Sequence, residues 1–228
     1  MNRTTRSIID ALMLGFLLTL MSHTYLSGAL HEAIGLCLLA AVAVHLRFSL
    51  RKTRRIRNAS IPWFRYTCRL IGMLLAVNLL LMAITGISLA RHLFALTEFT
   101  LRPSLARPLH RILAHTGFLL TGIHLGLRLP GFLALAGFRR RLPASHWFPR
   151  VPLYMAYGLT AAYGVAAAVR REYFRIDLSS NLMLFSNPEE PVAAFILDHA
   201  AILGLAITAG VLTRRFLSLI EILERNKG

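Results

Sequence analysis

The sequence predicts an all-α membrane protein with six transmembrane helices, and three observations lead to this prediction. First, 56% of the 228 residues are hydrophobic and only 16% are charged, whereas soluble domains average about 45–50% and about 25%. Second, six apolar runs are long enough to cross about 30 Å of hydrocarbon as helices. Third, the alternating segments of about ten residues that build membrane β-barrels are not visible in the sequence.

In chain order, the six runs are Ile8–Tyr25, Gly28–Phe48, Leu70–Phe94, Pro108–Leu129, Val151–Val169 and Val192–Leu212. The first follows two arginines as a signal peptide does, but it lacks a convincing small-residue cleavage site, so we expect a retained helix. The second, third and fifth are predicted from length and apolar character. Pro108 is expected to be the first helical residue of the fourth. Glu189 and Glu190 precede the sixth, where negative charge stabilises a helix N-terminus.

The distribution of positive charge predicts the orientation of these helices. If the six runs alternate in direction, 19 of the 26 Lys and Arg residues fall on the side of the two termini and 7 on the other side. Cytoplasmic connections are enriched in Lys and Arg. We therefore expect both termini in the cytoplasm, with residues 22–29, 96–107 and 170–191 outside.

The net charge of +16 is explained by this topology and does not require a nucleic-acid partner, because phosphate binding needs no long apolar runs. The two cysteines, Cys37 and Cys68, lie in or beside apolar runs and form no Cys-x-x-Cys pair. A disulfide framework, a cysteine zinc site and covalent c-type haem are therefore not expected.

Histidine spacing is the most informative pattern in the chain. His31 and His45 are fourteen residues apart in the second run, and His110 and His124 are fourteen apart in the fourth. Fourteen residues at 100° each leave a net rotation of about 40°, and they rise about 21 Å. Each pair therefore lies on one face of its helix, at two depths in the membrane.

The second and fourth helices are predicted to run in the same direction, so His31 faces His110 and His45 faces His124. Facing imidazoles in a helical bundle suit a haem iron with two axial histidine ligands. We expect two such sites, with the first four helices forming a haem-binding bundle (residues 1–130) and two further helices in residues 131–228. A single membrane histidine is more often a packing or hydrogen-bonding residue, but the repeated spacing favours paired ligands. Zinc is disfavoured, because rings about 21 Å apart cannot share one ion.

Arginines near these histidines are candidates for pairing with haem propionates, since the guanidinium group suits carboxylates. The outer candidates are Arg91, Arg107 and Arg111, and the inner candidates are Arg47 and Arg128. Contact with lipid headgroups is the alternative interpretation.

The other histidines receive different interpretations. His115 points away from the ligand face and is expected to pack or to contact a propionate. His23, His92 and His146 are expected to be interfacial. For His199, which follows Asp198, a hydrated boundary position is favoured over a quinone site or proton path. Gly35, Gly86, Gly117 and Gly122 are interpreted equally as room for a macrocycle or as ordinary close helix packing.

The chain resembles the flavinylation-associated transmembrane cytochromes, a bacterial family of small b-type membrane cytochromes. The similar stretches are SGALHEAIGLCLLAAVAVHL, NLLLMAITGISLARHLF and LHRILAHTGFLLTGIHLGL, with looser similarity in YGLTAAYGV and FSNPEEPVAAFILDHAAILG. Together they extend over most of residues 27–204. After His124 the chain departs from the family pattern, because Arg128 stands where histidine is frequent.

The resemblance implies that His31, His45, His110 and His124 are haem ligands. It also implies electron transfer across the membrane to an extracytosolic protein that carries covalent flavin, while the electron donor varies within the family. We expect a bacterial inner-membrane protein that receives electrons from quinol or a cytoplasmic donor. The expected protein is an electron carrier or an oxidoreductase subunit, and not a stand-alone catalyst. Two alternatives remain open: a quinone-reacting cytochrome b subunit of a larger complex, with quinone as a further cofactor, and a transporter or structural membrane protein without redox activity.

Overall fold

The computed structural model describes residues 3–54, 63–93, 101–135, 150–173 and 190–225. Within these ranges the chain forms six α-helices, one short 3-10 helix and no strand. In chain order the elements are α1 (Arg3–Met21), η1 (His23–Tyr25), α2 (Gly28–Arg54), α3 (Trp63–Leu89), α4 (Pro103–Leu135), α6 (Arg150–Arg170) and α7 (Val192–Arg225). The prediction of an all-helical chain is confirmed for the described residues.

Four helices are long and apolar enough to cross a membrane. The spans are Gly28–Ser49 in α2, Trp63–Leu89 (all of α3), Pro103–Leu129 in α4 and Val192–Glu224 in α7. Large apolar side chains are exposed on them, such as Leu80 at 62%, although a protein folded in water avoids extended apolar surface. These helices indicate a membrane protein whose outer surface is suited to lipid. Because α1 and α6 are not in this group, the first and fifth predicted spans stay predictions.

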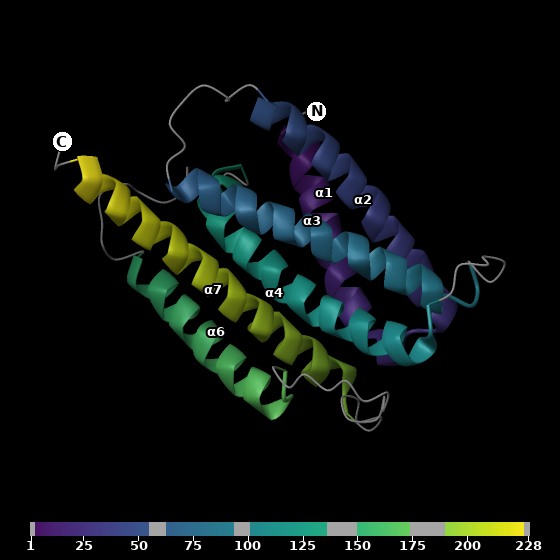
Figure 1. The fold of residues 1–228 in the computed structure, drawn as a ribbon. Helices are drawn as coiled ribbons and strands as arrows, with labels where there is room; N and C mark the ends of the chain where they lie inside the picture. Colours follow the sequence, from purple (N-terminus) through teal and green to yellow (C-terminus); the bar gives the residue numbers. More distant parts are fainter. Residues whose placement is uncertain (1–2, 55–62, 94–100, 136–149, 174–189, 226–228) are drawn as a thin grey trace.

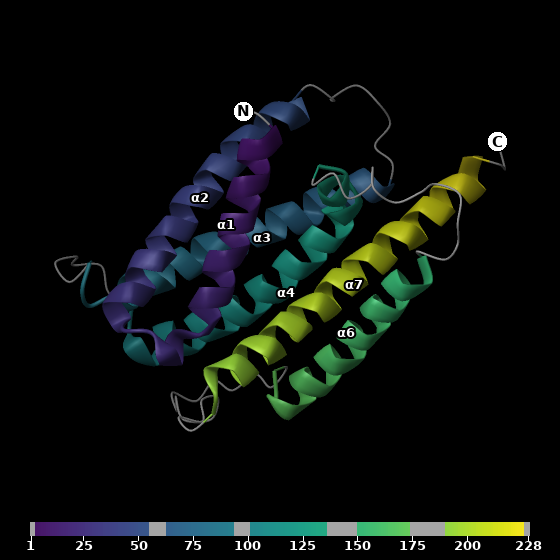
Figure 2. The same cartoon turned by 180° about the vertical axis from the view of Figure 1, so that it is seen from behind.

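The helices alternate in direction, so their ends gather at two opposite ends of the molecule (Figure 1). We call these the His31 end, where α2, α4 and α7 begin, and the His45 end, where they finish. α4 packs extensively against α3 on one side and α7 on the other, and α6 packs against α7. α1 packs against α2 and crosses near α4 and α7, as seen from behind in Figure 2.

Glycine permits the close approach of α4 to α7. A Cβ added to Gly126 would lie 2.9 Å from the Cα of Gly210 and closer still to the carbonyl oxygen of Ile207. A Cβ added to Gly210 would likewise collide with the backbone of α4 at Ile123. Close backbone approach through small residues is the usual packing mode of helices in lipid, and here it joins the fourth helix to the last one.

The observed helix limits differ from several predicted ones. α4 begins at Pro103, so Pro108 is not the first helical residue, and α3 ends at Leu89 and not at Phe94. The backbone hydrogen bonds that start α4 come from Leu105 and Ala106 to the carbonyl of Arg102. The reason is that apolar runs indicate where side chains fit lipid, while a helix continues into polar residues as long as its backbone bonds are made. The boundary proposed at residue 130 falls inside α4, and the division into two parts stays a prediction.

Candidate functional site

The four histidines of the predicted ligand set lie on α2 and α4. His31 and His110 are near the His31 end of the molecule, and His45 and His124 are toward the other end. α2 and α4 are not closely packed against each other, since α2 packs mainly on α1 while α4 packs on α3 and α7. Close-packed helix axes are about 8–10 Å apart. A planar group held between two imidazoles requires the two helices that carry them to be farther apart than this.

The structure brings His31 and His110 together. Their ring centroids are 6.4 Å apart, with an interplanar angle of 71°. Two imidazoles that bind one metal ion from opposite sides have centroids about 6.4 Å apart, because each centroid lies about 3.2 Å from the metal when the bond is about 2 Å long. The separation of the two rings therefore fits bis-histidine ligation.

His110 is held by α3. The Oγ1 atom of Thr85, a residue only 4% exposed, lies 3.1 Å from Nδ1 of His110. The same hydroxyl lies 3.0 Å from the carbonyl oxygens of Leu81 and Met82. A hydroxyl has one proton; donating it to these carbonyls leaves the oxygen to accept the Nδ1–H of His110. The Nε2 lone pair of His110 then remains for a metal ion.

Gly86 provides room for the same ring. A Cβ added to this glycine would lie 3.3 Å from Cε1 of His110, which is tighter than an ordinary van der Waals contact. Gly122, in contrast, faces Leu203 and Ala206 of α7, and Gly117 faces the amide of Asn78. One of the predicted glycines thus contacts a ligand candidate, while two of them serve helix packing.

His31 has a buried nitrogen and a histidine neighbour that was not expected. Its Nδ1 atom is buried without a hydrogen-bond partner among the described residues, which is unusual for a buried polar atom. His23, which the sequence analysis placed at the interface, lies with its ring centroid 6.3 Å from that of His31. Burial lowers the pKa of His23, and the nearby positive charge of Arg111 lowers it further, against a raising hydrogen bond to Met21. The neighbouring ring is thus held neutral at pH 7.

His45 and His124 are the second pair of ligand candidates. The Nδ1 atom of His45 lies 2.8 Å from Oδ1 of Asp10 on α1, and the two side chains are 23% and 24% exposed. Nδ1 of His124 is buried without a hydrogen-bond partner in the described part of the chain. The two rings are within electrostatic range of each other, but the described residues include no ring contact between them. The donor types fit a haem.

A carboxylate ties the end of α3 to the start of α2. Glu32, next to His31, accepts hydrogen bonds from the backbone N–H groups of Arg91, His92 and Leu93 at 2.8, 3.2 and 2.7 Å. Its Oε1 atom also lies 3.1 Å from Nδ1 of His92. The segment that follows α3 is therefore held against α2 beside the His31–His110 pair.

The arginines predicted to meet propionates lie at both ends. Arg91 and Arg107 are exposed at the His31 end, and Arg111 is half-buried within electrostatic range of His23. Arg47 and Arg128 are exposed toward the His45 end, where Arg128 hydrogen-bonds to Cys68 and lies near His124. Their assignment to propionates stays a prediction.

A buried ionic cluster lies between α6 and α7 at the His31 end. Asp198, 3% exposed, accepts hydrogen bonds from Tyr163 at 2.8 Å, Arg170 at 2.7 Å and Arg171 at 2.8 Å. Arg171 also pairs with Glu190. His199, the next residue, was expected at a hydrated boundary, and that interpretation is wrong, because it is 6% exposed. Tertiary packing of α6 on α7 supplies the partners that make the burial of Asp198 tolerable.

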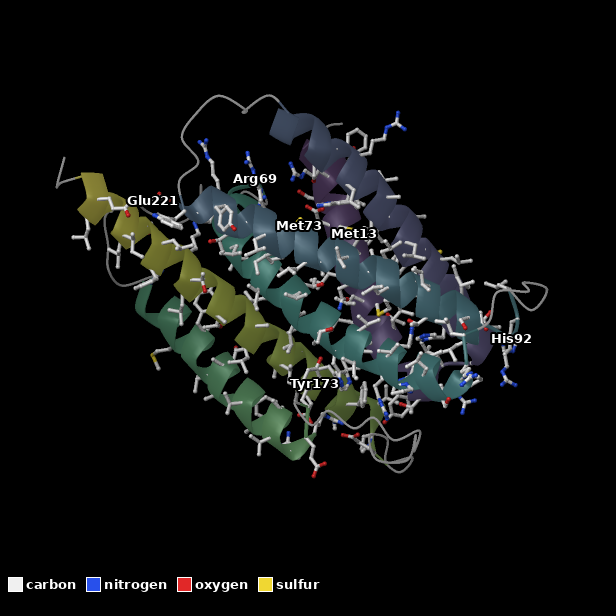
Figure 3. The ribbon with its side chains drawn as sticks, in the orientation of Figure 1. Met13, Arg69, Met73, His92, Tyr173 and Glu221 are labelled. Carbon is white, nitrogen blue, oxygen red and sulfur yellow. The ribbon has the colours of Figure 1, made fainter. Side chains whose placement is uncertain are left out.

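Aromatic rings adjoin this cluster. The His115 ring stacks on Tyr173 with centroids 4.5 Å apart, and Tyr173 meets His199 edge-on at 6.2 Å. His199 is 6% exposed and its Nδ1 donates to the carbonyl of Phe195 at 3.0 Å, so it too is buried and not hydrated. Burial raises the pKa of the Tyr173 hydroxyl. Tyr173 is labelled in Figure 3, below α4 in that view and apart from His92.

Comparisons with protein-family models, curated proteins and solved structures found no match to this chain. Among the described residues, no group of three or more His, Cys, Asp or Glu side chains is placed to hold a metal ion. A haem iron differs from a bare ion in this respect, because the macrocycle supplies the other ligands and the protein supplies only the axial ones.

Sequence reasoning missed the residues that hold the ligand candidates, chiefly Asp10 and Thr85. A signal for Asp10 was present, since it is the one acidic residue in the apolar run Ile8–Tyr25, and ionisable residues in such runs are functional by default. Thr85 had no comparable signal. A threonine in an apolar helix bonds to its own backbone in any case, and only the packing of α3 on α4 brings it to His110.

Proposed function

We propose that this chain is a b-type membrane cytochrome that carries electrons across the membrane with two non-covalent haems. His31 and His110 would hold one haem, and His45 and His124 the other. The observation that carries the proposal is the His31–His110 pair, with ring centroids 6.4 Å apart and His110 oriented by Thr85. When bound, each haem supplies a one-electron carrier.

The residues of the chain perform three tasks in this function. The histidines of α2 and α4 place two sites about 21 Å apart along the helices, which divides a membrane of about 30 Å into shorter intervals for electron transfer. Thr85 and Asp10 hold His110 and His45 with Nε2 presented to the metal. The surrounding apolar side chains exclude water, which favours retention of an apolar macrocycle.

We further propose six spans with both termini in the cytoplasm of a bacterial inner membrane. Exposed apolar side chains on α6 support the fifth span, including Leu159 at 69% and Val169 at 70%. The orientation follows from the 19 to 7 division of basic residues. It is tested with single cysteines at Ser180 and Ser60 after Cys37 and Cys68 are replaced by serine. An impermeant thiol reagent should label position 180 and not position 60 in intact cells, and the reverse pattern would invert the topology.

The haem sites are tested by spectroscopy of the purified chain. A reduced-minus-oxidised spectrum with haem quantified per polypeptide should give two b haems. His31→Ala and His110→Ala should each lose one haem, while His92→Ala and His115→Ala, as matched histidine controls, should keep both. A wild-type protein without haem, or haem loss in the controls alone, would reject the ligand set and favour a membrane protein without redox activity.

The acceptor that we propose is an extracytosolic flavin-bearing protein, and the donor is quinol or a cytoplasmic reductant. This part rests on the family resemblance, and Arg91, Arg107 and Arg111 give the His31 end a positive surface for propionates or an acidic partner. In vesicles reduced from the cytoplasmic side, a flavinylated acceptor outside should become reduced. If both haems are reduced and the acceptor is not, the partner assignment is wrong.

A quinone-reacting subunit is the second candidate function. The observation in its favour is the buried group of Tyr173, His199 and Asp198 at the His31 end, because buried hydroxyl and imidazole groups are suitable donors for a quinone carbonyl. Quinol-dependent haem reduction that His199→Gln abolishes, with both haems retained, would favour this function over the first.

A further inference from the structure

Asp10 is an ionisable residue in an apolar helix, and its position relative to His45 is specific. It is the one acidic residue of α1, Arg3–Met21. Its carboxylate contacts the imidazole of His45 across two helices, with Oδ1 2.8 Å from Nδ1. A charge in a membrane helix is costly and usually has a functional partner. The observed partner is a ligand candidate of the proposed function.

The four ligand candidates differ in what their Nδ1 atoms contact. Nδ1 of His45 meets a carboxylate, whereas Nδ1 of His110 meets the neutral hydroxyl of Thr85. Nδ1 of His31 and Nδ1 of His124 have no hydrogen-bond partner among the described residues. The two sites are therefore chemically unequal. At the His45 site a carboxylate touches a ligand candidate, whereas Glu32, the carboxylate beside His31, accepts hydrogen bonds from the backbone of residues 91–93.

A carboxylate that accepts the Nδ1–H of an imidazole makes the other ring nitrogen a stronger electron donor to a metal. The negative charge also stabilises the additional positive charge of the oxidised metal. Both effects lower the reduction potential at that site. The positive charge of Arg128 near His124 acts in the opposite direction, but this side chain is exposed and solvent screens it, while Asp10 is in direct contact with the ligand.

We propose that Asp10 is a positioning residue that makes the His45–His124 site the lower-potential site of the two, and so directs electrons from the His45 end to the His31 end. The inference rests on the proposed function. With haem bound, His45 and His124 would hold the site that gives up one electron, passing from ferrous to ferric. His31 and His110 would hold the site that accepts it, passing from ferric to ferrous, with no proton exchanged. The direction matches the predicted flow from the cytoplasmic to the external side.

The experiment is a potentiometric titration of the haem absorbance in the wild-type protein and in Asp10→Asn, which removes the charge and keeps a similar shape. The wild-type titration should resolve two components. In Asp10→Asn the reduction potential of the lower component should rise, so that the equilibrium constant between the two sites falls about tenfold. Loss of the partner of a metal-binding histidine has effects of about this size, and tenfold is about 59 mV for a one-electron couple. The upper component should stay unchanged.

Two further variants assign the result. His45→Ala should remove the lower component, and Asp10→Glu should restore a low potential if it retains the haem. Unchanged potentials in Asp10→Asn with both haems bound would overturn the inference, as would a rise in the upper component. Loss of a haem in both Asp10 variants would assign the residue a structural role and overturn the inference as well. Absence of haem from the wild-type protein would instead reject the proposed function.

Discussion

Replacing Thr85 by valine tests the contact that orients His110. The substitution keeps the branched shape of the side chain and removes the oxygen that lies 3.1 Å from Nδ1 of His110. The imidazole then loses a hydrogen-bond acceptor inside a site where Thr85 is 4% exposed. We expect weaker haem binding with little change in helix content, because the hydroxyl contributes to the orientation of the ligand and not to the path of α3.

The magnitude follows from the loss of one buried hydrogen bond, because the carbonyl of Met82 is a second partner of the His110 ring. Such a loss costs about 0.5–1.5 kcal/mol, which is about 2- to 13-fold in a binding constant. Loss of an outer partner of a metal-binding histidine gives about 10- to 100-fold. The expected result is thus a haem dissociation constant raised by about tenfold at one site and unchanged at the other.

The assay is haem titration of the apoprotein in detergent, followed by the absorbance of the bound form. Thr121→Val is the matched control, since its Oγ1 atom donates only to the carbonyl of Gly117 in its own helix, at 2.7 Å. It shares the loss of an intrahelical hydrogen bond and leaves His110 untouched. Equal effects of the two substitutions, or no effect of Thr85→Val, would refute the reasoning.

Three more predictions follow from the packing. Gly126→Ala forces α4 away from α7 and should destabilise the protein by about 1–3 kcal/mol in thermal unfolding. The control is Gly158→Ala, whose added Cβ would meet nothing within 4 Å and should not lower the melting temperature. Equal melting temperatures of the two variants would contradict the close packing of α4 on α7. Asp198→Asn removes the buried carboxylate that Arg170 and Arg171 share, while Glu190 still pairs with Arg171. It should therefore cost about 1–3 kcal/mol in the same assay, and an unchanged melting temperature would mean that the carboxylate does not stabilise the fold. Glu32→Gln weakens the charge-assisted hydrogen bonds from the backbone N–H groups of residues 91–93. Hydrogen exchange of these amides should therefore accelerate about tenfold. An unaltered exchange rate would show that the carboxylate does not hold the segment.

Periodicity predicted part of the candidate site. The fourteen-residue spacing places His31 and His45 on one face of α2, and it does the same for His110 and His124 on α4, because helix geometry depends only on residue number. The contact of His31 with His110 agrees with the predicted pairing. The pairing of His45 with His124 stays a prediction, since only electrostatic proximity connects the two rings.

The interpretation of His199, the neighbour of Asp198, was wrong because sequence position indicates depth along a helix but not which neighbour covers a side chain. Both residues lie near the start of α7, a depth at which hydration is common. The rotation of α7 turns them toward α6, where Arg171 and Tyr163 satisfy the carboxylate. A buried charge is stable only with such partners, and the partners come from a helix about thirty residues earlier in the chain.

By itself, the sequence determined the helical class, the apolar spans and the faces that carry histidine. These properties depend on local composition and on the fixed period of the α-helix. Only the tertiary structure decided that α4 packs between α3 and α7, that Thr85 meets His110 and that Asp10 meets His45. The physical reason is that helices in lipid associate through shape and a few polar contacts, without a strong apolar pattern to mark the interface. Which helix faces which therefore depends on the fit of whole surfaces, such as Gly126 against Gly210, and not on the order of residues in either helix.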